Sequence, residues 1–422
     1  MTVESVAADS YPRIVAALIR ITGDWTLAED CAQEALVSAV QRWPKDGIPG
    51  NPGGWLMTAA RNRAVDTLRR ASVERRKLAE LAALAVAVDD GPEIVSEEEV
   101  VDDRLRLVFT CCHPALALEA RVALTLRTIC AVPTADIARA FLVTEATMTR
   151  RLTRAKSKIA AARIPYRVPR GPALAERLPG VLAVLYLLFT QGYNAGGEPA
   201  FAEEAIRLAR LLRQLMPGQD EVSALLALFL LQHSRRDARR DLDGNLLPLD
   251  RQDRSDWDRP AITEGLGILA ELGVRSGLAG PYELQARIAA CHATAPSVPG
   301  TDWAQIARCY DELARIHSTP VVELNRAVAH GYAYGPRDGL AVLAAAREGG
   351  ELDGHPLALA ADADLTAKLG DHHRAATLYR QAAAVAHTDP ERRALLARAD
   401  ETTQTDASSR ADNSSRQAPY ET

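Results

Sequence analysis

A run of basic and hydroxyl side chains between residues 147 and 158 has the chemistry needed to read DNA. Arginine can donate two hydrogen bonds to a guanine edge, and threonine can bond base edges. The side chains expected on the outer face of a helix over this run are Thr149, Arg150, Thr153 and Arg154. The side chains expected to neutralise phosphates are Arg151, Lys156 and Lys158. The run therefore predicts a helix that recognises a nucleic acid.

The same run has an apolar side on which it can dock. Met148, Leu152 and Ala155 recur at helical spacing. A short helix is expected before it, from Pro133 through Phe141, followed by a turn at 142–144 whose Thr144 caps the basic helix. Two short helices joined by a tight turn, the second of them basic, are typical of a helix-turn-helix. The competing interpretation is a basic helix that is merely solvated.

Composition favours an all-α fold of two or three domains. The chain has 422 residues, 47 % of them hydrophobic and only 5 % aromatic. Its net charge of −5 does not by itself suggest a nucleic-acid partner. However, residues 1–170 hold 24 Lys and Arg against 21 Asp and Glu, and residues 146–170 hold eight basic side chains and no acidic one. Such a local cluster matters more for phosphate binding than the mean charge does.

Several other classes of function are disfavoured by the residues present. The six cysteines are scattered through helical patterns, as expected for small buried side chains in a reducing cytoplasm. Cys111, Cys112 and His113 are adjacent and would chelate a metal poorly, so no metal site is predicted. No Gly-rich phosphate loop or nucleophile elbow is found, so we expect no catalytic residue, no enzyme activity and no cofactor. The apolar stretch 178–189 contains Pro179 and Gly180 and is too short to span a bilayer, so no membrane partner is expected.

A second group of helices with polar faces is expected in the N-terminal part of the chain. Residues 10–80 are predicted to form three helices, with a Pro- and Gly-rich loop over 44–54. Thr26 and Glu29 have capping-box spacing at the start of the second helix. The face of that helix expected to be buried consists of Leu27, Cys31, Leu36, Val40 and Trp43. An acidic, flexible linker is expected over 81–103, and a second small helical domain over 104–165.

The C-terminal part reads as a long array of helices. About eleven helices are expected over 174–402, many of them opened by Pro or by capping residues. Near the end, Leu369-Gly370 is followed by Ala375, Tyr379, Ala382 and Pro390, which is the spacing of one tetratricopeptide unit. Residues 403–422 are polar and are predicted to be disordered.

Residues 134–159 resemble the fourth domain of extracytoplasmic-function sigma factors, although that family often has glycine where Leu142 and Ala146 stand. This resemblance implies that the helix-turn-helix reads the minus-thirty-five promoter element. Residues 28–34 resemble the acidic helix of the family's second domain, which docks on core RNA polymerase. The contacts implied for docking are Asp30, Gln33 and Glu34.

Residues 55–66 resemble the helix with which the family reads the minus-ten element. The residues implied in contacts with that element are Arg61, Asn62, Asp66, Arg69 and Arg70. The loop over 44–54 would hold a flipped base, because strand opening requires a base outside the stack. Trp55 is interpreted as a core residue rather than a wedge between bases.

Segments of the C-terminal part resemble a subgroup of the family that carries a large tetratricopeptide-like extension. These segments are 109–114, 185–193, 253–258, 280–285 and 324–328. The resemblance implies an alternative sigma factor in the cytoplasm that binds core RNA polymerase and promoter DNA. It also implies that the extension modulates activity and could bind a protein or peptide. The alternative is a helix-turn-helix regulator with a helical sensor domain. Two DNA-reading helices separated by a linker favour the sigma factor, because they suit two promoter elements about two helical turns apart.

Overall fold

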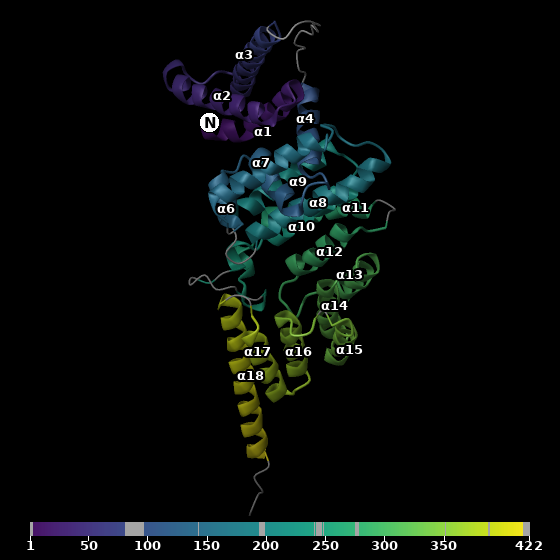
Figure 1. Ribbon diagram of the computed structural model, residues 1–422. Coiled ribbons are helices and arrows are strands. Elements are labelled where there is room, and N and C mark those ends of the chain that lie inside the picture. Colours follow the sequence, from purple (N-terminus) through teal and green to yellow (C-terminus); the bar gives the residue numbers. More distant parts are fainter. Residues whose placement is uncertain are drawn as a thin grey trace, which may run out of the picture. The chain divides into compact units, whose positions relative to one another are not determined.

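The computed structural model describes residues 3–80, 97–141, 143–193, 199–239, 241, 247, 249–274, 278–350, 352–386 and 389–416. Over these residues the regular structure consists of the α-helices α1 to α18 and three short 3-10 helices, with no strand (Figure 1). The predicted all-α fold is confirmed. The chain divides into two compact units, Met1–Pro217 and Gly218–Thr422.

The first three helices pack on one another. They are α1 (Val3–Thr22), α2 (Trp25–Asp46) and α3 (Pro52–Glu80). Because α2 continues through Asp46, the connection that was expected to begin at Pro44 begins at Gly47. The predicted capping box is wrong, since Asp24 caps α2 by accepting hydrogen bonds from the backbone nitrogens of Thr26 (2.8 Å) and Leu27 (3.1 Å). An aspartate at the N-cap satisfies two otherwise unpaired donors, which frees Glu29 for another contact.

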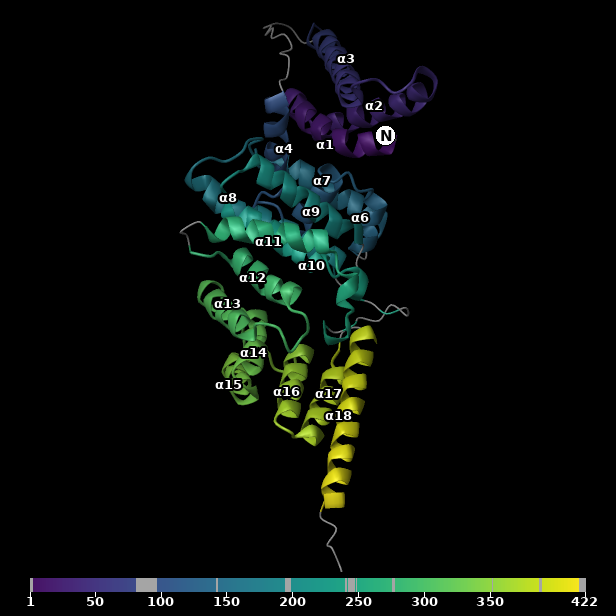
Figure 2. The same ribbon diagram turned by 180° about the vertical axis from the view of Figure 1, so that it is seen from behind.

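Six further helices complete the first unit. They are α4 (Glu97–Cys111), α5 (Leu118–Thr128), α6 (Thr134–Ala140), α7 (Glu145–Ala161), α8 (Pro172–Tyr193) and α9 (Pro199–Leu215). The last two belong to this unit because α8 packs on α9, α4 and α5, and α9 also contacts α4. Figures 1 and 2 show α8 and α9 close together from two opposite sides. The two compact units therefore do not divide near residue 174, where the sequence suggested that the extension starts.

Helix α8 is longer than the apolar stretch predicted at its centre. By length and composition alone, the 22 residues of the whole helix could cross a membrane. A core helix of a globular unit can pass the same test. In this structure α8 buries an apolar face inside the first unit, formed by Leu178, Val181, Leu182, Val184, Leu185, Leu188 and Phe189.

The second unit is built from helices that pack mainly on their neighbours in the chain. They are α10 (Asp220–His233), α11 (Arg259–Gly273), α12 (Pro281–Thr294), α13 (Trp303–Ile316), α14 (Pro320–Ala333), α15 (Pro336–Arg347), α16 (Pro356–Lys368), α17 (His372–Ala384) and α18 (Asp389–Arg416). With α8 and α9 they match the expected number of about eleven helices. Sequential pairs such as α14 with α15 and α17 with α18 form closely packed hairpins. The assignment of these pairs to the tetratricopeptide class stays a prediction.

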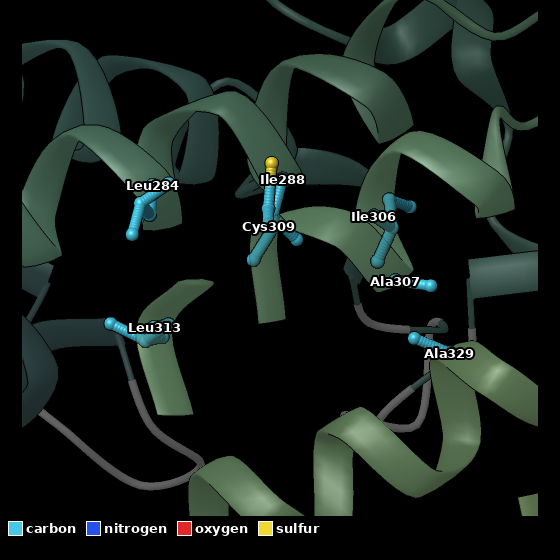
Figure 3. Packing of buried hydrophobic residues seen from close by; sticks show 7 residues of the cluster. All are labelled: Leu284, Ile288, Ile306, Ala307, Cys309, Leu313 and Ala329. Carbon is cyan, nitrogen blue, oxygen red and sulfur yellow. The ribbon is translucent and has the colours of Figure 1, made fainter. Parts of the chain in front are cut away.

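The core of the second unit consists of small and branched apolar side chains. One cluster joins α12, α13 and α14 through Leu284, Ile288, Ile306, Ala307, Cys309, Leu313 and Ala329 (Figure 3). Alanines at such contacts let helix backbones approach closely, which explains the low aromatic content.

The tail differs from the sequence prediction. Residues 403–416 are helical as the end of α18, so disorder was the wrong expectation there, and 417–422 lie outside the described residues. The start of α18 is anchored on α17 by buried Leu395 and Ala399. The hydroxyl of Thr403 donates to the carbonyl of Ala399 at 2.8 Å. A packed helix start propagates into polar residues because extending a helix costs less than nucleating one.

Candidate nucleic-acid and polymerase interfaces

Helix α7 has the two faces that its sequence predicts. The hydroxyl of Thr144 caps it by accepting from the backbone nitrogen of Thr147 at 3.3 Å. Met148, Leu152 and Ala155 are buried, together with Ile159. The preceding turn is closed by a hydrogen bond of 3.0 Å from the nitrogen of Val143 to the carbonyl of Ala138. The helix-turn-helix is thus formed by α6 and α7.

Leu142 and Ala146 stand where the resembled family often has glycine. Ala146 lies inside the first turn of α7 and is exposed, a place where alanine is fully compatible with the backbone. Leu142 lies outside the described residues.

One side of α7, adjoining its buried face, is hollowed and strongly basic. A cavity of about 360 Å³ opens between α7 and the start of α5. Its charged lining consists of Arg150, Arg151, Arg154 and Lys158, and Leu116, Ala117 and Ala120 form its apolar side. Thr149 and Thr153 are exposed but do not line it. Four cations around one hollow create a positive potential that suits a phosphate group or the acceptor edge of a guanine.

Arg151 is held more firmly than the other arginines of this face. A terminal nitrogen of its guanidinium lies 3.3 Å from Oε2 of Glu119, and the group lies 5.8 Å from the ring centre of Phe141. Glu119 is the acidic residue in the first turn of α5. These two contacts fix the guanidinium at the edge of the hollow, so binding would need little further ordering.

Lys156 does not lie in the hollow with Arg150, Arg151, Arg154 and Lys158. Its Nζ lies 2.6 Å from Oε2 of Glu29 on α2, and both side chains are largely buried, with exposures of 18 % and 10 %. Two residues of helix separate Lys156 from Arg154 by about 200°, which turns the lysine away from the hollow. The structure therefore brings four of the seven predicted residues, Arg150, Arg151, Arg154 and Lys158, to the hollow. It leaves Thr149 and Thr153 exposed elsewhere on α7 and pairs Lys156 with Glu29.

Helix α2 exposes an acidic face that continues into apolar side chains. Asp30, Gln33 and Glu34 are all exposed, as a docking surface requires. Val37 and Val40 follow along the helix and are 55 % and 58 % exposed. The prediction that Val40 is buried is wrong, because alanines at 32, 35 and 39 fill the interface with the neighbouring helices instead. The two valines could have been identified by their spacing, since Val37 lies about one helical turn and Val40 about two turns after Gln33.

Helix α3 carries the residues predicted to read the minus-ten element. Leu56, Ala60 and Ala64 are buried and fix the helix on its neighbours. Asn62, Asp66, Arg69 and Arg70 are exposed and Arg61 is half-buried. Trp55 is half-buried and meets the ring of Trp43 edge-to-face, with ring centres 5.6 Å apart. Beside Asn62, the guanidinium of Arg63 pairs with Glu34 and donates to the hydroxyl of Ser38 at 2.9 Å, joining α3 to the docking helix.

Of the cysteines near α4 and α5, Cys111 and Cys112 are buried and Cys130 is half-buried. Burial raises the pKa of the Cys112 thiol to about 11 and holds the pKa of Cys111 and Cys130 well above their usual value. Nδ1 of His113 accepts a hydrogen bond from the nitrogen of Ala115 at 3.1 Å, which uses this ring nitrogen in a turn. Within the described residues, no group of three or more His, Cys, Asp or Glu side chains lies together as a metal site.

Comparison with known protein families agrees with this arrangement. Sigma-70 region 2 matches residues 7–73, and sigma-70 region 4 matches residues 106–159. A family of unknown function, DUF6596, matches residues 177–272. The chain is 41 % identical over 350 residues to the uncharacterized protein R00370 of Rhizobium meliloti (strain 1021), which covers 81 % of this chain and 82 % of that protein. No solved structure matched the chain.

The region 2 match covers most of α1, all of α2 and most of α3, and the region 4 match runs from the end of α4 through most of α7. Both helices predicted to read DNA therefore lie in domains of the expected kind. The two matches do not favour the alternative of a regulator with one DNA-binding domain. The chain belongs to the sigma-70 family as a sigma factor of the extracytoplasmic-function type with a C-terminal extension, and it directs promoter-specific initiation of transcription.

Proposed function

We propose that three helices of the first unit, α2, α3 and α7, have separate roles in the initiation of transcription. Helix α2 docks on core RNA polymerase through Asp30, Gln33 and Glu34, with the exposed Val37 and Val40 extending the contact. An acidic patch with an apolar margin suits a basic partner surface that also offers an apolar pocket.

Promoter recognition is assigned to α3 and α7. On α3, the groups proposed to contact the minus-ten element are Arg61, Asn62, Asp66, Arg69 and Arg70. On α7, those proposed for the minus-thirty-five element are Thr149, Arg150, Arg151, Thr153, Arg154, Lys156 and Lys158. The observation that best supports the proposal is the hollow on α7, in which three arginines and a lysine converge. Lys156 can join the DNA contacts only after its pairing with Glu29 is broken.

A run-off transcription assay with core polymerase tests the proposal. In it, Arg150→Ala with Arg154→Ala abolishes recognition of the upstream element and leaves binding to core polymerase intact. Asp30→Ala with Glu34→Ala has the reverse effect. The matched control is Arg167→Ala with Arg170→Ala, which removes the same charge from exposed positions outside the hollow. Loss of core binding in the arginine pair of α7, or equal loss of recognition in the control, contradicts the assignment.

The C-terminal extension is proposed to modulate this activity rather than to bind DNA. Residues 171–422 hold 26 Lys and Arg against 34 Asp and Glu. This excess of acidic residues disfavours binding to DNA phosphates. Exposed Val321 and Leu357 offer apolar contacts for a protein or peptide partner. Replacing both by Asp in the full chain should change transcription while the affinity for core polymerase stays the same, and unchanged transcription argues against a role for these surfaces. A sigma factor that works on core polymerase is also expected to act in the cytoplasm.

A further inference from the structure

The connection between α10 and α11 is fixed at its base inside the second unit. Trp257, just before α11, is only 3 % exposed, and the guanidinium of Arg254 lies 4.5 Å from the centre of its ring system. The backbone nitrogen of Asp258 donates to the carbonyl oxygen of Ser234 at 2.8 Å. The two ends of the connection therefore meet, and the contacts of residues 249–254 determine where its later part lies. We call residues 249–254 the strap.

Arg254 anchors the strap on the end of α12. Its Nη1 donates to the carbonyl oxygens of His292 and Ala295, both at 2.8 Å. Both carbonyls belong to the C-terminal end of α12, where carbonyl groups lack partners within the helix and the helix dipole favours a cation. Two hydrogen bonds and a stacked ring thus hold this end of the strap.

The other end of the strap reaches α18, which follows α12 in the chain only after α13 to α17. Oδ2 of Asp250 accepts a hydrogen bond from Nη2 of Arg398 at 3.3 Å, and the guanidinium of Arg251 pairs with Glu401. Arg398 and Glu401 are three residues apart and therefore share one face of α18. An acid followed by a base in the strap thus meets a base followed by an acid on the helix.

The contacts with α18 are weaker than those with α12. Both ion pairs face solvent, since the side chains of Asp250 and Arg251 are 47 % and 50 % exposed. An exposed ion pair shifts an equilibrium by about fivefold at most, and salt screens it. Trp257 and the hydrogen bonds of Arg254 do not depend on these pairs. The α18 end of the strap can therefore detach while the α12 end stays in place.

Detachment would leave Arg398 in need of a carboxylate. Burial acts to lower the pKa of its guanidinium, but nearby acidic groups, with Asp250 the strongest, outweigh burial and raise the pKa. A second acid near it, Asp364, is already paired with Lys368 at 2.9 Å. In the described part of the chain, the ion pair that Arg398 makes is the one with Asp250. The surface is therefore complementary to a segment that supplies a carboxylate to Arg398 and a cation to Glu401.

We propose that the face of α18 bearing Arg398 and Glu401 is a docking site for a segment of a partner protein in which a basic residue follows an acidic one. In the free protein the strap occupies this site as an internal ligand, and its two charges define the chemistry of the partner. Because the strap belongs to the same chain, it competes at an effective concentration of millimolar order. The inference names the partner of the extension and rests on the modulatory role proposed for it above.

Limited digestion of the full-length chain by trypsin tests whether α18 holds the strap. Cleavage after Arg251 requires the strap to leave the helix, so its rate follows the detached fraction. Arg398→Ala with Glu401→Ala should speed this cleavage by about tenfold. The matched control Asp389→Ala with Arg392→Ala removes an exposed ion pair from the first turn of the same helix and should leave the rate unchanged. Circular dichroism checks that each variant remains folded.

A labelled synthetic peptide of residues 247–258 tests the docking chemistry by fluorescence anisotropy. The variant Asp250→Ala with Arg251→Ala lacks the charges of the internal ligand and should bind the peptide about tenfold more tightly than the wild-type chain does. Adding Arg398→Glu with Glu401→Arg to this variant should abolish binding. A peptide carrying Asp250→Arg with Arg251→Asp should bind again, because both partners are then reversed.

Equal cleavage in all three digested proteins, or peptide binding that ignores the charge reversal, overturns the docking site. Sedimentation that shows a dimer joined by exchanged straps would assign the surface to a second copy of the chain and would also overturn it. Transcription with core polymerase is measured on the same variants. Charge-dependent peptide binding without any change in transcription supports the docking site and contradicts only the modulatory role of the extension.

Discussion

Glu221, at the start of α10, caps the beginning of α12 from across the second unit. Its Oε2 accepts a hydrogen bond of 2.9 Å from the backbone nitrogen of Tyr282, and its Oε1 accepts one of 3.2 Å from that of Glu283. Gly280 makes room for this carboxylate, because a Cβ at that position would lie 2.3 Å from Cδ of Glu221. This contact gives a structural reason for the Gly-Pro-Tyr-Glu segment over 280–283.

Replacing Glu221 by Ala should destabilise the second unit by about 1–2 kcal/mol, since two partly buried backbone donors lose their acceptor. Chemical denaturation followed by circular dichroism measures the change. Glu312→Ala, which removes an exposed acid from α13, serves as the control and should stay within about 0.5 kcal/mol of wild type. Equal stability of both variants would show that the cap contributes nothing.

The crossing of α14 and α15 depends on a pair of glycines. A Cβ on Gly339 would lie 2.6 Å from Cα of Gly331 and 2.8 Å from the carbonyl oxygen of Ala327. Gly339→Ala should therefore force the helices apart and cost about 2–3 kcal/mol of unfolding free energy. Gly267→Ala is the matched control, because nothing lies within 4 Å of its added carbon in α11. That control should be neutral or stabilising by up to about 1 kcal/mol, and a comparable loss there would contradict the steric argument.

The lowered pKa of the His292 imidazole predicts that acid destabilises the second unit. Burial, with Arg235 and Arg254 nearby, lowers the pKa of its imidazole to about 4. Between this value and the ordinary pKa of about 6.5, the unfolded chain binds more protons than the folded one, so stability is lost as the pH falls through this window. The loss should approach about 2 kcal/mol at pH 4.

Comparing His292→Gln with wild type by thermal unfolding at pH 7 and at pH 4.5 tests this prediction. The variant should lose less stability on acidification than the wild type does. His373→Gln, at an exposed position of α17, should retain the full loss. An identical pH dependence in all three proteins would mean that the imidazole does not control the acid response.

The exposed valines of α2 should contribute to the binding of core polymerase. Val37→Ala with Val40→Ala is expected to weaken binding by about tenfold, because truncation removes apolar area from the proposed contact. Folding should be unaffected, since both side chains are more than half exposed. Fluorescence anisotropy with labelled sigma factor measures the affinity. Ile316→Ala with Leu369→Ala, exposed apolar residues of the second unit, should leave it unchanged.

Much of the first unit could be predicted because its signals are local. Thr144 as a cap, Met148 and Leu152 as the buried side of α7, and the exposed Arg150 follow from helical spacing and capping chemistry alone. The acidic face at Asp30 and Glu34 follows from the same spacing. The region 2 and region 4 matches confirm the domains in which these helices lie.

Other features depend on partners that are distant in the sequence. Thr26 and Glu29 have the spacing of a capping box, yet Asp24 caps α2 and Glu29 pairs with Lys156, more than a hundred residues away. Val40 reads as a core residue, but neighbouring alanines fill the helix contact and leave it exposed. The polar tail reads as disordered, but packing of Leu395 and Ala399 nucleates a helix that continues to Arg416.

The sequence by itself determined which helices form and which of their faces are basic, acidic or apolar, because these properties depend on residues within one or two turns. Only the tertiary structure decided that Lys156 faces region 2 instead of the basic hollow, and that Arg20, Asp103 and Tyr166 hold the two regions together. The physical reason is burial. A charge far from solvent takes the partner that folding brings within reach, and spacing along one helix carries no information about that partner.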